Sequence, residues 1–121
     1  MRVLLFQPRF ADLVRRGFKT QTIRTHARCK PGDAVSLRTW IGKARQKGSY
    51  QKVLLESVCT EVSPVSVSRG GIGTIDMVML DGSPNAETFA QADGFANFAD
   101  MRDWFKSTHD LPFHGELIKW R

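Results

Sequence analysis

Short runs of apolar and β-branched residues, each bounded by turn residues, constrain the fold of this chain more than any other feature. Their lengths and composition are typical of β-strands. They cover residues 3–6, 20–25, 34–40, 53–67, 72–80 and 115–120. The run at 53–67 is long enough for one strand or two, and Pro64 limits the pairing that it can make. The pattern predicts a small sheet of about five to six strands.

Helical spacing of apolar residues interrupts these runs, so the chain mixes both kinds of element. After Asn97, a favourable helix cap, Phe98, Met101 and Phe105 recur at helical spacing, and we expect them to pack in the core. The predicted helices are Arg9–Arg16, Ala86–Ala92 and the segment that Asn97 caps. The order of strands and helices predicts an α+β fold with a small barrel-like sheet and two to three flanking helices.

The length of 121 residues and the apolar fraction of 41% suit a single domain spanning residues 1–121. No run approaches the roughly 18 apolar residues of a membrane span, and the first residues become polar too soon for a signal peptide. Cys29 and Cys59 form no C-x-x-C pair, so we expect reduced thiols and no metal site. These features predict a monomeric, cytoplasmic protein without membrane contact.

Basic residues are concentrated in the first half of the chain. Residues 1–52 hold thirteen Lys or Arg and two acids, whereas residues 53–121 hold five basic and ten acidic residues, and the whole chain carries a net charge of +6. Such segregation is typical of a surface that contacts phosphates. It favours RNA as partner, with DNA as an alternative and a merely solubilising surface as another.

Lys19, Thr22 and Arg24 form the most concentrated group of polar side chains. Lys19 follows the end of the first predicted helix, and Thr22 and Arg24 fall on one face of the predicted strand. A nearby guanidinium disfavours the charged form of an amine, so Lys19 could act as a base toward the Thr22 hydroxyl. Alternatively, Lys19 and Arg24 bind phosphate while Thr22 fills a strand position, since K-x-x-T spacing is common.

A basic loop is predicted between Gly42 and Tyr50. Its cations would contact phosphates, and Trp40 and Tyr50 at its ends could stack on a base, although a tryptophan in the position of Trp40 is more often a core residue. The predicted substrate or nucleic-acid contacts outside the catalytic group are Arg9, Arg24, Arg38, Trp40, Lys43, Arg45 and Lys47.

An ordered set of motifs, taken together, resembles the ASCH domain family in the short form found in bacteria and their phages. The resemblance covers essentially the whole chain. Its residues are Phe6–Phe10 (FQPRF), Gly17–Arg24 (GFKTQTIR), Lys30–Asp33 (KPGD), Ala92–Phe95 (ADGF), Met101 and Ile118–Trp120 (IKW).

The resemblance implies a PUA-like β-barrel of mostly antiparallel strands whose basic cleft binds RNA or a modified nucleoside or base. Some small members of the family are amidohydrolases that deacetylate acetylcytidine with a lysine, a threonine and a glutamate, and another branch has ribonuclease activity. The lysine falls on Lys19, the threonine on Thr22 and the glutamate on Asp93, which is one methylene shorter. No metal or cofactor is implied.

Two functions are therefore predicted, a binding module first and a metal-independent hydrolase as the alternative. In the hydrolase, Thr22 attacks the acyl carbon, Lys19 takes its proton, Arg24 stabilises the developing charge and Asp93 orients Lys19 or the substrate amine. Asp93 could instead only form a turn before Gly94. A protein-interaction domain is a third reading, which the uneven charge disfavours.

Overall fold

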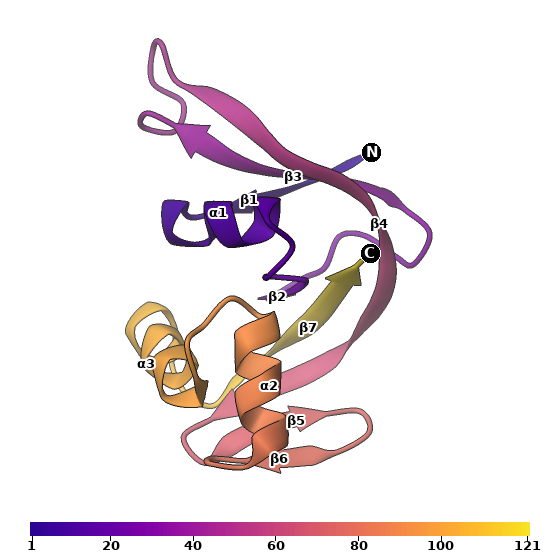
Figure 1. Cartoon of the computed structure of the whole chain (residues 1–121), viewed down its shortest axis with the longest axis vertical. Coiled ribbons are helices and arrows are strands. Elements are labelled where there is room, and N and C mark those ends of the chain that lie inside the picture. Colours follow the sequence, from indigo (N-terminus) through magenta and orange to yellow (C-terminus); the bar gives the residue numbers. More distant parts are fainter.

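The computed structural model describes residues 1–121 and shows an α+β fold with three helices and a seven-stranded mixed sheet (Figure 1). The elements are β1 (Arg2–Phe6), α1 (Pro8–Arg15), β2 (Gln21–Arg24), β3 (Ala34–Ile41), β4 (Tyr50–Ser68), β5 (Gly71–Thr74), β6 (Val78–Leu80), α2 (Pro84–Ala92), α3 (Phe98–Thr108) and β7 (Phe113–Trp120). The predicted α+β class and the three predicted helices are confirmed.

The 19-residue strand β4 connects the two parts of the sheet, because it pairs with three other strands. Its first half pairs with β3, and its second half pairs with β7 and, at the far end, with β5 (Figure 1). The 53–67 run is thus one strand, and Pro64 stays within the ladder opposite Glu116. Every pairing is antiparallel except that of β1 with β3, which is parallel.

The sheet does not close, so the prediction of a small barrel was wrong. β1 and β6 lie at the two ends of the strand path, and β2 pairs only with β7, which leaves no ladder to complete a cylinder. The strand number also exceeds the five to six predicted. The 72–80 run is divided by a turn in which Thr74 and Met77 exchange backbone and side-chain hydrogen bonds, and it forms the β5–β6 hairpin.

The helices begin and end where their local sequence directs. Pro8 occupies the first turn of α1, and Gly17, with φ +80°, follows its end in the left-handed region that glycine tolerates best. The Asn97 side chain accepts a hydrogen bond from the Asp100 backbone N–H and caps α3. As predicted, Phe98, Met101 and Phe105 are buried. No helix of the structure is long and apolar enough to span a membrane.

Two groups of elements lie on either side of the β2–β7 pair in Figure 1. One group contains β1, β3, the first half of β4 and α1, and the other contains α2, α3, β5 and β6. A single cluster of 23 buried apolar residues includes side chains from both groups. Residues far apart in the sequence therefore meet where α1 and β2 face α3.

Candidate functional site

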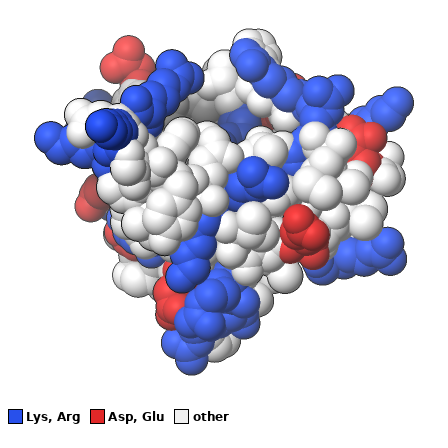
Figure 2. All heavy atoms as spheres, turned by 90° about the horizontal axis from the view of Figure 1, so that it is seen from above, with Lys and Arg blue, Asp and Glu red and all other residues white.

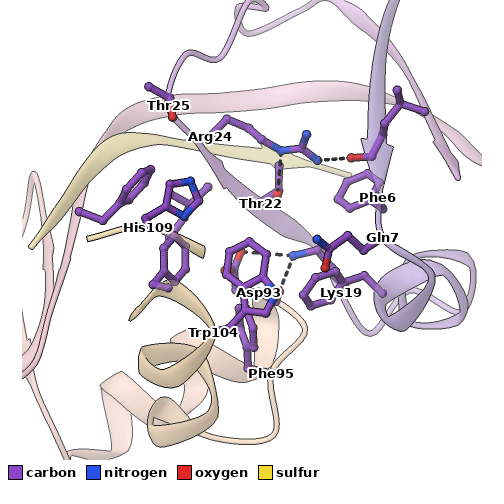
Figure 3. A pocket seen from close by; sticks show the side chains of 15 residues that line it. Phe6, Gln7, Lys19, Thr22, Arg24, Thr25, Asp93, Phe95, Trp104 and His109 are labelled. Carbon is purple, nitrogen blue, oxygen red and sulfur yellow. Dashed lines mark hydrogen bonds and ion pairs between the residues drawn. The ribbon is translucent and has the colours of Figure 1, made fainter. Parts of the chain in front are cut away.

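A cavity of about 330 Å³ lies among β1, α1, β2 and α3 (Figure 3). This volume falls within the range of about 300–1,000 Å³ usual for small-molecule sites. In Figure 3, Arg24, Gln7 and Lys19 lie around Phe6 on one side of the cavity, and His109, Trp104 and Phe95 lie across from them. Its lining residues are Leu5, Phe6, Gln7, Phe10, Lys19, Thr22, Ile23, Arg24, Thr25, Asp93, Phe95, Trp104, Phe105, His109 and Phe113.

Lys19 and Asp93, which are 74 positions apart in the chain, form a buried pair in this cavity. The Lys19 Nζ lies 3.4 Å from Asp93 Oδ1 and also donates to the Asp93 backbone oxygen. Their side chains are each 3% exposed. The segments meet because the Thr20 backbone N–H donates to the Ala92 carbonyl, which ties the chain after α1 to the end of α2. Asp93 therefore points at Lys19, as the hydrolase hypothesis requires.

Gly94 makes room for this pair. Its φ of +95° lies in the left-handed region, and a Cβ placed there would lie 2.8 Å from Lys19 Cδ and 3.0 Å from Phe10 Cδ1. The Asp-Gly dipeptide thus does two things at once. It ends α2 at Asp93, and it lets the backbone pass close to the aliphatic stem of Lys19.

Burial controls the ionisation of the pair. Removal from water raises the pKa of Asp93 to about 6, against the opposing effect of the Lys19 charge. Burial likewise lowers the pKa of Lys19, and the nearby charges of Arg24 and Arg9 add to this while Asp93 opposes it. Both shifts favour the neutral forms. The proton between amine and carboxylate therefore moves more easily than in a solvent-exposed ion pair, which suits general acid–base chemistry.

Thr22 and Arg24 occupy one face of β2, which confirms that they are neighbours. Arg24 Nε donates to Thr22 Oγ1 at 3.2 Å, and its Nη2 donates to the Leu5 carbonyl at 2.8 Å. The guanidinium also lies 4.9 Å from the centre of the Phe6 ring. These three contacts fix the guanidinium at the edge of the cavity, where its Nη1 has no hydrogen-bond partner in the protein.

The opposite wall of the cavity is aromatic. Phe10 packs edge-on against Phe95 and Trp104, with ring centres 5.3 and 6.0 Å apart. His109 extends this wall, with its ring centre 4.5 Å from that of Phe113. Flat rings beside charged groups can hold a planar, polar ligand by stacking while its edge meets hydrogen-bonding groups.

Sequence reasoning missed Trp104, His109 and Phe113 as site residues. Trp104 carried a usable signal, because it is a large aromatic residue beside the buried stripe of α3 and not on it. His109 and Phe113 follow α3 without any distinguishing spacing. Only the packing of α3 against β7 brings these two rings into the cavity.

The other predicted contacts lie outside the cavity. Arg9 forms an ion pair with Asp100 at 3.0 Å and covers the Phe95 ring from outside, at 5.1 Å from its centre. Arg38 donates from Nε to Ser36 Oγ on the same strand and from Nη1 to Gln51 Oε1 on the neighbouring strand β4. Trp40 is half-buried on β3.

Lys43, Arg45 and Lys47 are exposed in the loop between β3 and β4, which forms a projecting tip in Figure 1. None of the three lines the cavity. Viewed from the same end, Lys and Arg side chains are spread around the periphery of the molecule, and only small acidic patches lie between them (Figure 2).

The site thus combines a buried amine–carboxyl pair, a hydroxyl, a fixed guanidinium and an aromatic wall. No three His, Cys, Asp or Glu side chains lie close enough together to hold a metal ion. Comparisons of the chain with protein-family models, curated proteins and solved structures gave no match. The case for function therefore depends on the chemistry of the cavity itself.

Proposed function

We propose that the cavity binds the base of RNA or of a modified nucleoside. The observation that carries this proposal is the buried Lys19–Asp93 pair facing the aromatic wall around Trp104. A nucleobase presents a flat ring to such a wall and alternating donors and acceptors to such a pair. The resemblance of the Gly17–Arg24 and Ala92–Phe95 motifs to the ASCH domain supports the same ligand class.

The hydrogen-bonding groups of the cavity match the edge of a pyrimidine. Lys19 Nζ and Arg24 Nη1 are donors suited to a carbonyl oxygen, and the Asp93 carboxyl can accept from an amine or amide N–H. Burying an ion pair costs desolvation free energy that its mutual attraction often does not repay, so such a pair is weak evidence for a stabilising role. An ionisable pair that lines a cavity and has shifted pKa values is a candidate ligand site. The resemblance and the geometry thus point to the same residues.

Binding is tested by calorimetric titration of the purified protein with cytidine, acetylcytidine and uridine. We expect saturable binding to at least one of them, and we expect Trp104→Ala to weaken it by about tenfold through loss of stacking worth roughly 1–3 kcal/mol per base. The matched control is Trp40→Ala, which changes a tryptophan outside the cavity. If all three nucleosides fail to bind, or if both variants weaken binding equally, the proposal is wrong.

A second candidate is an amidohydrolase that deacylates an N-acylated cytidine, and the contact between Lys19 and Asp93 favours it. The Thr22 hydroxyl would attack the acyl carbon while the Lys19 amine takes its proton. Arg24 would stabilise the negative charge on the acyl oxygen, and the proton would pass to the departing amine of the base. Water would then cleave the threonyl ester and release the acid. Asp93 would orient Lys19 throughout.

Hydrolysis is tested by incubating the protein with acetylcytidine and following the appearance of cytidine and acetate. The hydrolase hypothesis predicts that Thr22→Val and Lys19→Ala abolish turnover, that Thr22→Ser retains part of it, and that Thr22→Val still binds the nucleoside. Absence of deacetylation by a wild-type protein that binds acetylcytidine would leave the binding proposal and reject the hydrolase.

A further inference from the structure

Two open grooves adjoin the cavity along β1 and the connection between β2 and β3. Arg24 lines both the cavity and the first groove, which has a volume of about 400 Å³. Arg2 and Arg28 line both this groove and the next one, of about 790 Å³. The three hollows therefore lie next to one another, with an arginine at each junction, and we call this row of hollows the path.

The path is strongly basic, and no cation that lines the two grooves forms an ion pair. Besides these arginines, His26 lines the first groove and Lys30 the second. Arg2, Arg28 and Lys30 are exposed and form no ion pair. No acidic residue lines the first groove. Asp33 is the one acid in the second, and its Oδ2 accepts a hydrogen bond from the Lys30 backbone N–H at 3.0 Å.

The wall that carries Arg28 is fixed at both ends. The preceding residue, Ala27, is buried and donates its backbone N–H to Glu116 Oε1 at 3.1 Å. Beyond it, the Gly32 N–H donates to the Cys59 carbonyl at 2.8 Å. Arg28 itself has φ +55°, a conformation that costs free energy for a residue other than glycine. These contacts hold the wall of the groove in place before any ligand binds.

We propose that the cavity takes its base from a single-stranded nucleic acid, whose backbone phosphates lie along the path through Arg24, Arg28 and Arg2. This inference rests on the proposed binding of a base in the cavity. A free nucleoside has no phosphate to occupy the grooves, whereas a strand whose base enters the cavity places its neighbouring phosphodiesters beside the Arg24 junction. Arginine binds phosphate oxygens in a bidentate manner, so the unpaired Arg2 and Arg28 at the second junction match this ligand, while Arg24 adds positive charge at the first.

The test compares a nucleoside that binds in the cavity with RNA and DNA oligomers of about ten nucleotides that contain the same base. We expect the oligomers to bind at least tenfold more tightly at low salt, and we expect their affinity to fall as salt rises while that of the nucleoside does not. RNA binding more tightly than DNA would identify the ribose 2′-hydroxyl as a further contact.

The decisive variant is Arg28→Asn, because asparagine tolerates the left-handed backbone at this position. Its matched control is Arg69→Asn between β4 and β5, an exposed arginine that lines neither the cavity nor the grooves. We expect Arg28→Asn to weaken oligomer binding about tenfold, to reduce the salt slope by about 0.7, and to leave nucleoside binding unchanged. Thermal unfolding of both variants verifies that they remain folded.

Three outcomes overturn the inference. If the nucleoside binds and the oligomers bind no more tightly, the grooves hold no phosphate and only the base proposal survives. If the oligomers bind and Arg69→Asn weakens them as much as Arg28→Asn, the contact is a diffuse charge effect. If neither nucleoside nor oligomer binds, the base proposal fails together with this one.

Discussion

Two groups of cations from the basic half of the chain have opposite surroundings. Lys19 and Arg24 are held inside the cavity, where Lys19 is 3% exposed and Arg24 makes three fixed contacts. The cations at positions 43, 45 and 47 are exposed in the β3–β4 loop and form no ion pair. The same charge is thus held in a fixed, dehydrated position in one place and left in contact with solvent in the other.

The two groups of cations differ in how much water surrounds each charge. In a buried site, removal from water shifts the pKa of a charged group and makes its partner indispensable. At an exposed site, water and salt screen the charge, and its removal alters little except the attraction of a polyanion. The two groups should therefore respond very differently to matched substitutions.

The largest effect is expected from Asp93→Ala, which leaves Lys19 buried without its carboxylate. We expect the free energy of unfolding at pH 7 to fall by about 3–5 kcal/mol, the usual cost of breaking a buried pair. Chemical denaturation measures it. The control is Asp81→Ala, which breaks the more exposed ion pair with Arg102 and should cost at most about 1 kcal/mol. Equal losses in both variants would mean that burial makes no difference.

The next effect concerns pH. Because burial raises the pKa of Asp93 from 3.8 to about 6, the folded protein binds a proton more readily than the unfolded chain between these values. The stability that this group contributes is therefore greatest below about pH 4 and decreases as the pH rises through 6, by roughly 2–3 kcal/mol in total.

This dependence is isolated by measuring unfolding of the wild type and of Asp93→Asn at several pH values from 4 to 7. The stability of the wild type relative to the variant should decrease as the pH rises. If the relative stability of the wild type instead increases with pH, the attraction between Asp93 and Lys19 outweighs the loss of hydration. Proton transfer between the two groups would then be no easier than in an exposed ion pair.

An effect of similar size is expected from Gly94→Ala, because the new Cβ would lie too close to Lys19 Cδ and Phe10 Cδ1. We expect a loss of about 2–3 kcal/mol, together with weaker nucleoside binding, as Lys19 is displaced. Gly82→Ala is the control, since Gly82 has φ +83° and no atom within 4 Å of the new Cβ. The Gly82→Ala variant introduces the backbone strain without any steric clash. If it loses as much stability as Gly94→Ala, the close contact between residue 94 and Lys19 does not explain the loss.

The sequence predicted the local parts of this site better than its assembly. The end of α1 at Gly17 and the shared face of Thr22 and Arg24 follow from short-range rules of helix capping and strand alternation. Motif resemblance, not spacing, selected Asp93 as the carboxylate. Its approach to Lys19 depends on a hydrogen bond between Thr20 and Ala92, which no local pattern encodes.

The errors have the same origin. The barrel was inferred from the order of strands and helices and from the family resemblance, whereas closure depends on which edges pair, and β2 pairs only with β7. The same holds for the basic half of the chain, whose cations are divided by folding between the cavity, the grooves and the loop. A linear count of charge cannot anticipate that division, because it depends on long-range pairing.

The smallest effect on stability is expected from neutralising the loop with the double substitution Lys43→Gln and Lys47→Gln. Both side chains are exposed without ion pairs, so the free energy of unfolding should change by less than about 0.5 kcal/mol. If the loop contacts phosphates, as the sequence predicts, oligonucleotide affinity falls and its salt slope is reduced by about 0.7 for each phosphate that the loop no longer binds.

Nucleoside binding should not change in this variant, since neither lysine lines the cavity. A matched pair, Arg69→Gln and Lys106→Gln, removes the same charge from exposed positions beyond β4 and at the end of α3. If this pair lowers oligonucleotide affinity as much as the loop variant does, the loop acts only through net charge. If the loop variant weakens nucleoside binding, the cavity and the loop are not separate sites, and the contrast between buried and exposed cations no longer explains their roles.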